Sequence, residues 1–328
     1  MTGIKGDEIG IRKRHIAQGI VLTSIVLILP ALLLEFAWLY GLAPLPAFYL
    51  ATLLGRKAGT IAITVAIVLS GVVTGIAGGL PNMLFGLGLL PAGFVLAYSV
   101  KRGDTPHIAG LKASLVILLI WATGWLGLAM NQGVNPYQES IKSLDQNMVT
   151  WYEIYTKSAQ PQTGDTKEIE TAVIELRNLI PKVFPALMLM SVCMTVWLNM
   201  MAGQWLNKTV SGHSPWPHYR EWKLPEHLVW GVVVCVAGLI LPNERVQTFA
   251  LNLLLVLGTL FFFQGMAVLS HLLERWKFPS LLRVIIFILI CVQVFGIFFL
   301  SILGLLDTWF DMRQMRPKEN EDIDQTSF

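Results

Sequence analysis

Five uncharged amides accompany long apolar runs of this sequence, where a polar side chain has few partners. They are Asn82, Asn199, Asn252, Gln264 and Gln293. Within a membrane, such side chains either join neighbouring helices or mark a binding site. We take the five as candidates for substrate binding or for helix packing. No acidic or basic residue lies near the middle of an apolar run, which disfavours a proton-relay pump and an intramembrane protease.

Glycines are concentrated between residues 71 and 93. Gly71 and Gly75 form a GxxxG pair, which allows two helix backbones to approach closely. Gly79, followed by Pro81 and Asn82, is typical of a tight turn. We favour close packing inside a helical bundle, with Gly71, Gly75 and Gly79 as contact residues. The alternative is a helix that breaks beside a binding cavity, as transporter half-helices do.

Nothing in the sequence matches a phosphate-binding loop, a dinucleotide fingerprint, a nucleophile elbow or a zinc-protease helix. Three histidines fall close together, at 213, 218 and 227, but their spacing fits no known metal site. The three cysteines lie in apolar runs and form no CxxC pair. We therefore expect no enzymatic activity, no cofactor and no metal.

The composition shows which elements must carry these residues. Of the 328 residues, 54% are hydrophobic and 14% are charged, whereas soluble domains carry roughly a quarter charged residues. A soluble chain could not cover this apolar surface, so we expect the lipid bilayer as its environment. The net charge of only +3 makes no case for nucleic acid as a partner.

The apolar runs predict an all-α, polytopic transmembrane bundle. There are about nine spans, or eight if a short segment does not cross, because a crossing needs about 20 helical residues. The second segment is short and contains two prolines, so it is the candidate for a re-entrant half-helix. The segments are about 16–40, 43–54, 58–77, 82–100, 111–130, 183–206, 227–242, 246–272 and 283–306.

Lysine and arginine predict the orientation of the chain. If the N-terminus is cytoplasmic, every inner turn is basic and the short outer loops carry only Arg245. We therefore expect a multi-pass protein of the bacterial cytoplasmic (inner) membrane with a cytoplasmic N-terminus.

The loop at 131–182 is too long for a simple turn and has its own periodicity. Apolar residues recur at spacings of three and four on both sides of the break at Pro161–Gly164. This pattern predicts an extracytoplasmic, amphipathic helical hairpin. The hairpin could lie on the lipid interface, cover a cavity or dock a partner.

These features divide the chain into four parts. They are a basic cytoplasmic N-terminus (1–15), a six-span bundle that includes the hairpin (16–206), a three-span C-terminal part (207–306) and a charged tail (307–328).

Three runs in the last third carry a family resemblance. They are Glu221–Pro225, Phe263–Ala267 and Gly304–Arg313. Together they resemble the YybS-like family of bacterial multi-pass membrane proteins, which has no assigned chemistry. The resemblance implies that the motif residues matter for the family's structure or function. They are Trp222, Pro225, Gly265, Gly304, Asp307 and Arg313.

The first six spans are similar in layout to the substrate-binding subunits of energy-coupling-factor vitamin transporters, and more distantly to MreD-type envelope proteins. In those transporter subunits an AxxxA pattern docks the coupling subunit. Ala43, Ala47 and Ala51 have this spacing. The resemblance therefore implies a docking surface on this segment.

Two functions remain open. The first is a small-molecule substrate-capture subunit without its own ATPase, which requires a ligand-sized cavity among the first six spans. The alternative is a non-transport envelope or assembly component that acts by docking protein partners. The bilayer is the expected partner of either, and a second membrane-protein subunit is compatible with both.

Overall fold

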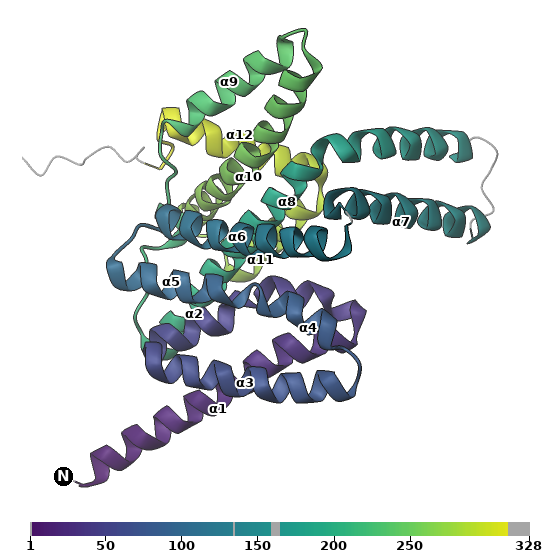
Figure 1. The fold of residues 1–328 in the computed structure, drawn as a ribbon. Coiled ribbons are helices and arrows are strands. Elements are labelled where there is room, and N and C mark those ends of the chain that lie inside the picture. Colours follow the sequence, from purple (N-terminus) through teal and green to yellow (C-terminus); the bar gives the residue numbers. More distant parts are fainter. Residues whose placement is uncertain (1, 134, 159–164, 314–328) are drawn as a thin grey trace, which may run out of the picture. The chain divides into compact units, whose positions relative to one another are not determined.

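Every regular element that the structure describes is a helix, so the all-α class is confirmed (Figure 1). This computed structural model describes residues 2–133, 135–158 and 165–313. The chain forms two compact units, which divide between Trp216 and Pro217.

Seven helices in the described residues are long and apolar enough to cross a bilayer. The count becomes eight if the bent pair Ser280–Ile290 and Phe295–Phe310 forms one span. The predicted nine would require the helix Leu228–Ile240 to cross as well. That helix has 13 residues, so it extends about 20 Å, against a hydrocarbon core of about 30 Å.

In the residues that the structure describes, the first unit contains nine helical elements. They are α1 (Thr2–Leu32), the 3-10 helix η1 (Leu34–Leu42), α2 (Pro44–Leu53), α3 (Arg56–Ile76), α4 (Leu80–Leu87), α5 (Leu90–Arg102), α6 (Pro106–Gln132), α7 (Pro136–Ser158) and α8 (Asp165–Ser211). Two of the candidate spans are composite, because η1 continues into α2 and α4 continues into α5.

Helix α2, the short proline-bearing segment, lies at the centre of the first unit. It packs against α3, α5 and α8, and η1 and α2 together are long enough to span the bilayer. Its prolines lie in the first turn, where the missing N–H donors cost little. A Cβ on Gly93 of α5 would lie 2.1 Å from the carbonyl oxygen of Pro44, so the two backbones approach as only glycine allows.

Ala43, Ala47 and Ala51 are all buried inside the first unit. The predicted docking surface is therefore wrong, because these small residues are buried in contacts within the first unit. The span layout is consequently the only feature that still supports the resemblance to energy-coupling-factor subunits and to MreD.

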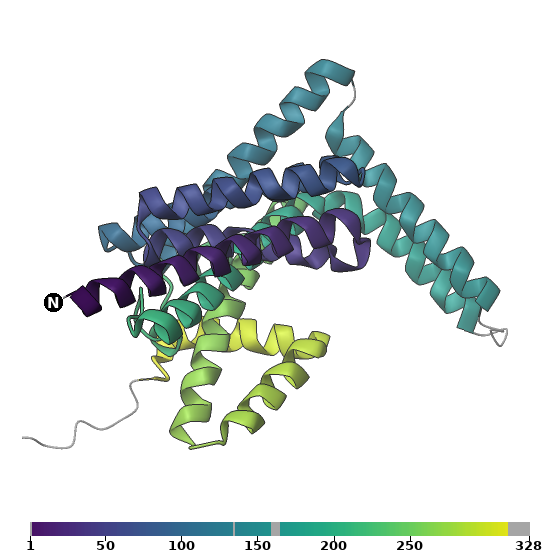
Figure 2. The same ribbon diagram turned by 90° about the horizontal axis from the view of Figure 1, so that it is seen from below.

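The predicted helical hairpin is confirmed as α7 packed against the first part of α8. Helix α8 is continuous from the hairpin through the sixth span, and its 47 residues extend about 70 Å, far more than the bilayer is thick. The hairpin and the start of α1 lie at opposite ends of the first unit (Figures 1 and 2). Arg177 makes a two-pronged ion pair with Asp145, at 2.5 and 2.9 Å, which lowers the pKa of that carboxyl group.

Tyr137 provides a hydrogen-bond donor for a backbone carbonyl in α8 that lacks its usual helical partner. The carbonyl of Pro181 would normally accept from the N–H of residue 185, but Pro185 has no N–H. The hydroxyl of Tyr137 donates to this carbonyl at 3.0 Å, and its ring lies edge-on to Phe184. The hairpin is thereby anchored where α8 continues into the bundle.

Replacing Tyr137 with phenylalanine should loosen the hairpin while keeping the ring contact. The lost hydrogen bond is worth about 1 kcal/mol, so amide exchange in α7 should become about fivefold faster. Hydrogen–deuterium exchange with mass spectrometry measures this. Tyr152→Phe on the same helix is the control, because no partner of its hydroxyl lies in the described residues. Equal exchange in both variants would contradict the assigned role.

The boundary between the units falls after Trp216, later than the expected boundary after residue 206. Trp216 belongs to the first unit because its ring stacks on Phe48 at 5.5 Å and its indole N–H donates to the carbonyl of Asp104 at 3.1 Å. Helix α8 itself continues to Ser211.

The second unit is built around one long helix, α10. Its elements are the 3-10 helix η2 (Tyr219–Glu221), α9 (Leu228–Ile240), α10 (Glu244–Arg275), α11 (Ser280–Val292) and α12 (Val294–Phe310). Helix α10 packs on α9 and, most extensively, on α12. The chain bends by 107° between α11 and α12.

The predicted start of the tail at residue 307 lies inside α12, and Asp307 is buried. Residues 307–313 therefore belong structurally to the second unit. The rest of the predicted tail, 314–328, lies outside the described residues.

Candidate functional site

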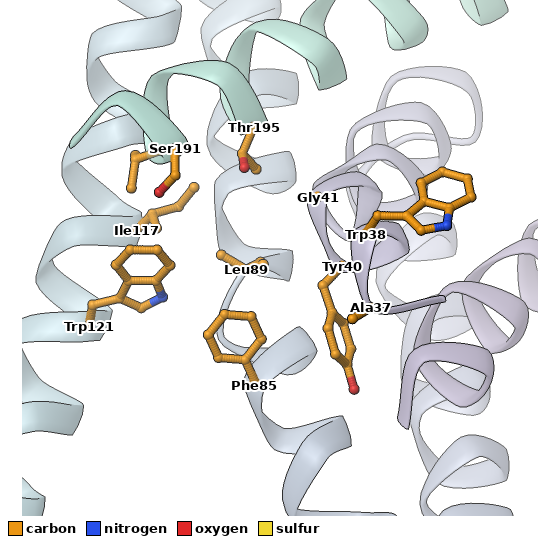
Figure 3. A pocket seen from close by; sticks show the side chains of 11 residues that line it. Ala37, Trp38, Tyr40, Gly41, Phe85, Leu89, Ile117, Trp121, Ser191 and Thr195 are labelled. Atoms are coloured by element: carbon orange, nitrogen blue, oxygen red, sulfur yellow. The ribbon is translucent and has the colours of Figure 1, made fainter. Parts of the chain in front are cut away.

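A pocket of about 200 Å³ lies among the helices of the first unit (Figure 3). Four elements line it: η1, the α4–α5 region, α6 and α8. The lining residues are Ala37, Trp38, Tyr40, Gly41, Phe85, Leu89, Ile117, Trp121, Ser191, Val192 and Thr195. It lies among the first six predicted spans, where the substrate-capture hypothesis expects a cavity.

One of the predicted amides, Asn199, holds the η1 wall of this pocket in place, whereas Asn82 contacts this wall through its backbone. Asn199 is fully buried in α8, and its amide donates to the carbonyl of Gly41 at 2.6 Å. The backbone carbonyl of Asn82 accepts from the hydroxyl of Tyr40 at 2.7 Å, and its side chain donates to the carbonyl of Ala31. Both amides therefore act as helix-joining groups, and neither lines the pocket.

The wall formed by α4 and α5 contains a helix break. Helix α4 ends at Leu87 and α5 begins at Leu90, so Leu89 lies in the interruption and Phe85 in the turn before it. Gly79 lies earlier, where a Cβ would be 2.7 Å from the carbonyl oxygen of Ala31. Both alternatives for the glycine region thus find support, since Gly79 serves close packing and the break borders a cavity.

The pocket surface is aromatic and uncharged. Phe85 lies between Tyr40, edge-on at 5.5 Å, and Trp121, stacked at 6.1 Å. The polar groups at the pocket are the side chains of Trp38, Tyr40, Trp121, Ser191 and Thr195. These groups can hold a small molecule, but they include no carboxylate, imidazole or thiol that could serve as an acid, base or strong nucleophile.

In the second unit the family motif residues converge on one buried ion pair. Arg313 donates to Asp307 through two nitrogens, at 2.5 and 3.3 Å, and the two side chains are 6% and 0% exposed. Gln264 donates to the same carboxylate at 2.9 Å. The predicted candidate Gln264 is therefore a packing group of this cluster.

The same ion pair fixes the loop that precedes α9. Arg313 donates to the carbonyls of Arg220 and Trp222 at 2.9 and 2.7 Å. Gln264 accepts from the N–H of Leu224 at 3.1 Å. Pro225 follows directly. Its carbonyl accepts a hydrogen bond from the backbone N–H of Leu228, the first residue of α9.

Gly265 and Gly304 bring α10 and α12 into backbone contact. A Cβ on Gly265 would lie 1.9 Å from the carbonyl oxygen of Leu300, and one on Gly304 would lie 2.0 Å from that of Phe261. The motif residues therefore form one structural joint between α10 and α12, which consists of a close glycine contact and a buried ion pair.

The remaining predicted residues belong to neither feature. Asn252 donates back to the carbonyl of Thr248 on its own helix, and Gln293 lies exposed at the bend before α12. In the described part of the first unit, no atom lies within 4 Å of a Cβ built on Gly71 or Gly75. Their predicted helix contact is not made within this unit.

Sequence reasoning missed the pocket residues Tyr40, Trp121, Ser191 and Thr195. The available signal was weak, because aromatic and hydroxyl residues are common in membrane helices. No group of three or more His, Cys, Asp or Glu side chains among the described residues could hold a metal ion.

This combination of long apolar helices, buried amides and a glycine joint defines a multi-pass α-helical membrane protein. The chain belongs to the family described as "Predicted membrane protein (DUF2232)", whose model matches residues 19–308. It is also similar to the "Uncharacterized protein YybS" of Bacillus subtilis (strain 168), at 24% identity over 235 residues. That match covers 68% of this chain and 72% of the relative. The YybS-like resemblance is thereby confirmed. No solved structure matches the chain.

Proposed function

We propose that this protein captures a small molecule in the pocket of its first unit and hands it to a partner subunit. The observation that carries the proposal is an uncharged, partly open aromatic pocket of about 200 Å³ that is lined by candidate membrane spans. A liquid water occupies about 30 Å³, so this space suits a compact ligand.

The construction of the pocket favours capture over catalysis. Its η1 wall is held by hydrogen bonds to Asn82 and Asn199, which pre-organise the site before a ligand arrives. The uncharged lining suits reversible binding, and we propose that the protein has neither an enzymatic activity nor an ATPase of its own.

We further propose that the protein lies in a bacterial inner membrane with its N-terminus in the cytoplasm. The basic inner turns support this orientation. Helix η1 follows the end of α1, so the pocket wall that it forms would lie toward the outer half of the membrane. A capture subunit would receive its ligand from that side.

Native mass spectrometry of the protein, gently extracted from its own membranes, tests the proposal. The wild type should carry a small molecule of discrete mass. Gly41→Leu should abolish it, because Gly41 lines the pocket and has open space at its Cβ position. Gly71→Leu is the matched control, since its Cβ also meets no atom but lies away from the pocket.

A wild-type protein without a bound small molecule would contradict the capture function. So would a Gly41→Leu variant that carries the same ligand at the same occupancy. Retention in Gly71→Leu together with loss in Gly41→Leu assigns the ligand to the pocket.

The alternative function, docking of a protein partner, has one specific observation in its favour. Helix α7 is mostly polar, yet Trp151 and Ile154 are 57% and 59% exposed on it. A photo-crosslinking amino acid at position 151 distinguishes the two environments. A discrete protein adduct in intact membranes would support docking, whereas lipid adducts alone would oppose it.

A further inference from the structure

We infer that one end of the first unit binds anionic phospholipids, whose phosphate groups contact a surface of exposed cations. This basic surface consists of Arg14, Arg56, Lys57, Lys101 and Arg102. The inference concerns a second kind of ligand and does not depend on the proposed capture function. Three observations carry it: the cations share one end of the unit, they lack carboxylate partners there, and they lie at the ends of candidate spans beside exposed apolar residues.

The first three cations are brought together by contacts among α1, α2 and α3. A Cβ on Gly19 of α1 or on Gly59 of α3 would lie within 3 Å of an atom of Leu50 in α2, at 2.2 and 2.8 Å. Arg14 precedes Gly19 by little more than one helical turn, and Arg56 precedes Gly59 by less than one turn. The start of α1 and the start of α3 therefore lie close to each other.

The end of α5 lies at the same end of the unit. Trp216 stacks on Phe48 of α2 and donates to the carbonyl of Asp104, which follows Lys101 and Arg102 after one intervening glycine. Figures 1 and 2 both show the start of α1, the α2–α3 turn and the end of α5 at one end of the first unit. The five cations thus form one surface.

This surface lacks compensating negative charge. None of the five cations forms an ion pair with a carboxylate in the part of the chain that the structure describes. Asp104 is close by, but Lys112 binds it at 2.5 Å. The pKa of Asp104 is lowered chiefly by this hydrogen bond and less by the charge of Arg102. By contrast, Lys142 and Arg177 in the hairpin each have a carboxylate partner.

The depth of the cations in the membrane favours lipid phosphate as their partner. Arg14, Arg56 and Arg102 are terminal residues of three candidate spans. The end of a span lies where the hydrocarbon core meets the headgroups, and long basic side chains extend toward that layer. Clustered cations at this level attract anionic headgroups.

Exposed apolar residues continue from the cations along the same helix faces. Lys57, Ile61 and Val65 follow each other at four-residue spacing on α3, and the two apolar side chains are 64% and 41% exposed. On α5, the guanidinium of Arg102 lies 5.7 Å from the ring centre of Tyr98, which is 55% exposed. A phospholipid matches both parts, with its phosphate at the cations and its acyl chains along the apolar faces. An acidic peptide matches only the charge.

Native mass spectrometry of the full chain in a non-ionic detergent tests the inference. The probes are phosphatidylglycerol, phosphatidylcholine with the same acyl chains, glycerol 3-phosphate and a polyglutamate peptide. Arg56→Gln/Arg102→Gln removes two cations of the surface, whereas Arg56→Lys/Arg102→Lys keeps their charges. Lys142→Gln/Arg177→Gln is the matched control, because it removes two cations that already have carboxylate partners.

The wild type should bind phosphatidylglycerol about thirtyfold more tightly than phosphatidylcholine. In Arg56→Gln/Arg102→Gln, the affinity for phosphatidylglycerol should fall about tenfold while that for phosphatidylcholine stays unchanged. The lysine variant and the matched control should bind both lipids as the wild type does. Higher salt should weaken the binding of phosphatidylglycerol, because it screens exposed charges.

Equal affinity of the wild type for the two lipids would overturn the inference. An equal loss of phosphatidylglycerol in the matched control would overturn the assignment to this surface, since net charge alone would then explain the binding. Glycerol 3-phosphate that binds as tightly as phosphatidylglycerol would indicate a soluble phosphate compound as the ligand. Tighter binding of polyglutamate would indicate an acidic protein segment, and either result would exclude a lipid as the preferred partner.

Discussion

Replacing Arg313 with methionine should lower the free energy of unfolding by about 3–5 kcal/mol. The substitution keeps an unbranched side chain of similar volume but removes the charge that faces Asp307. The carboxylate of Asp307 is fully buried, so among the described residues it would keep only the side-chain amide of Gln264 as a donor. The carbonyls of Arg220 and Trp222 would lose the same guanidinium, so the loop before α9 should loosen as well.

Unfolding by SDS titration in mixed micelles measures this loss. Lys223→Met is the matched control, because Lys223 pairs with Asp311 close to the same helix end, at 45% and 33% exposure. That exposed pair should contribute at most about 1 kcal/mol. The double variant Asp307→Asn/Arg313→Met should recover part of the stability, since it removes the unpaired charge. Similar losses for Arg313→Met and Lys223→Met would disprove the assigned importance of the buried pair.

Gly265→Ala should destabilise the second unit by about 3 kcal/mol, the upper part of the range for overpacking. The added Cβ would lie 1.9 Å from a backbone oxygen of Leu300, and a backbone atom cannot turn away as a side chain can. Helices α10 and α12 would have to separate, which weakens the joint that also holds Gln264 and Asp307 together.

Gly258→Ala provides the control on the same helix, because no atom lies within 4 Å of the Cβ position there. It should be neutral or stabilising by about 0.5–1 kcal/mol, since alanine favours helix interiors. Thermal unfolding of both variants in the same detergent measures the contrast. A Gly265→Ala protein as stable as Gly258→Ala would show that α10 and α12 do not meet at this position.

The sequence was sufficient to predict the class of protein and most of its helices. Long apolar runs with few charges are stable in a bilayer as helices, because a helix satisfies its own backbone hydrogen bonds. The three- and four-residue spacing in 131–182 likewise predicted the helical hairpin. Local periodicity determines such elements, so no knowledge of distant contacts was needed.

Counting the spans was harder, because crossing depends on the length of a helix and on its neighbours. The segment with Pro44 and Pro46 looked too short to cross, yet it continues from η1 and becomes the centre of the first unit. The helix Leu228–Ile240 is apolar throughout but is short of the bilayer thickness.

Only the tertiary structure decided what the polar residues do. The sequence named Asn82, Asn199 and Gln264 as candidates. Long-range contacts made the side chain of Asn82 a contact to α1, that of Asn199 a support of a pocket wall and that of Gln264 a partner of Asp307. The pocket itself joins residues from 37 to 195, which no local pattern relates. The physical reason is that helix formation depends on neighbours three and four residues apart, whereas a cavity depends on which helix faces pack together.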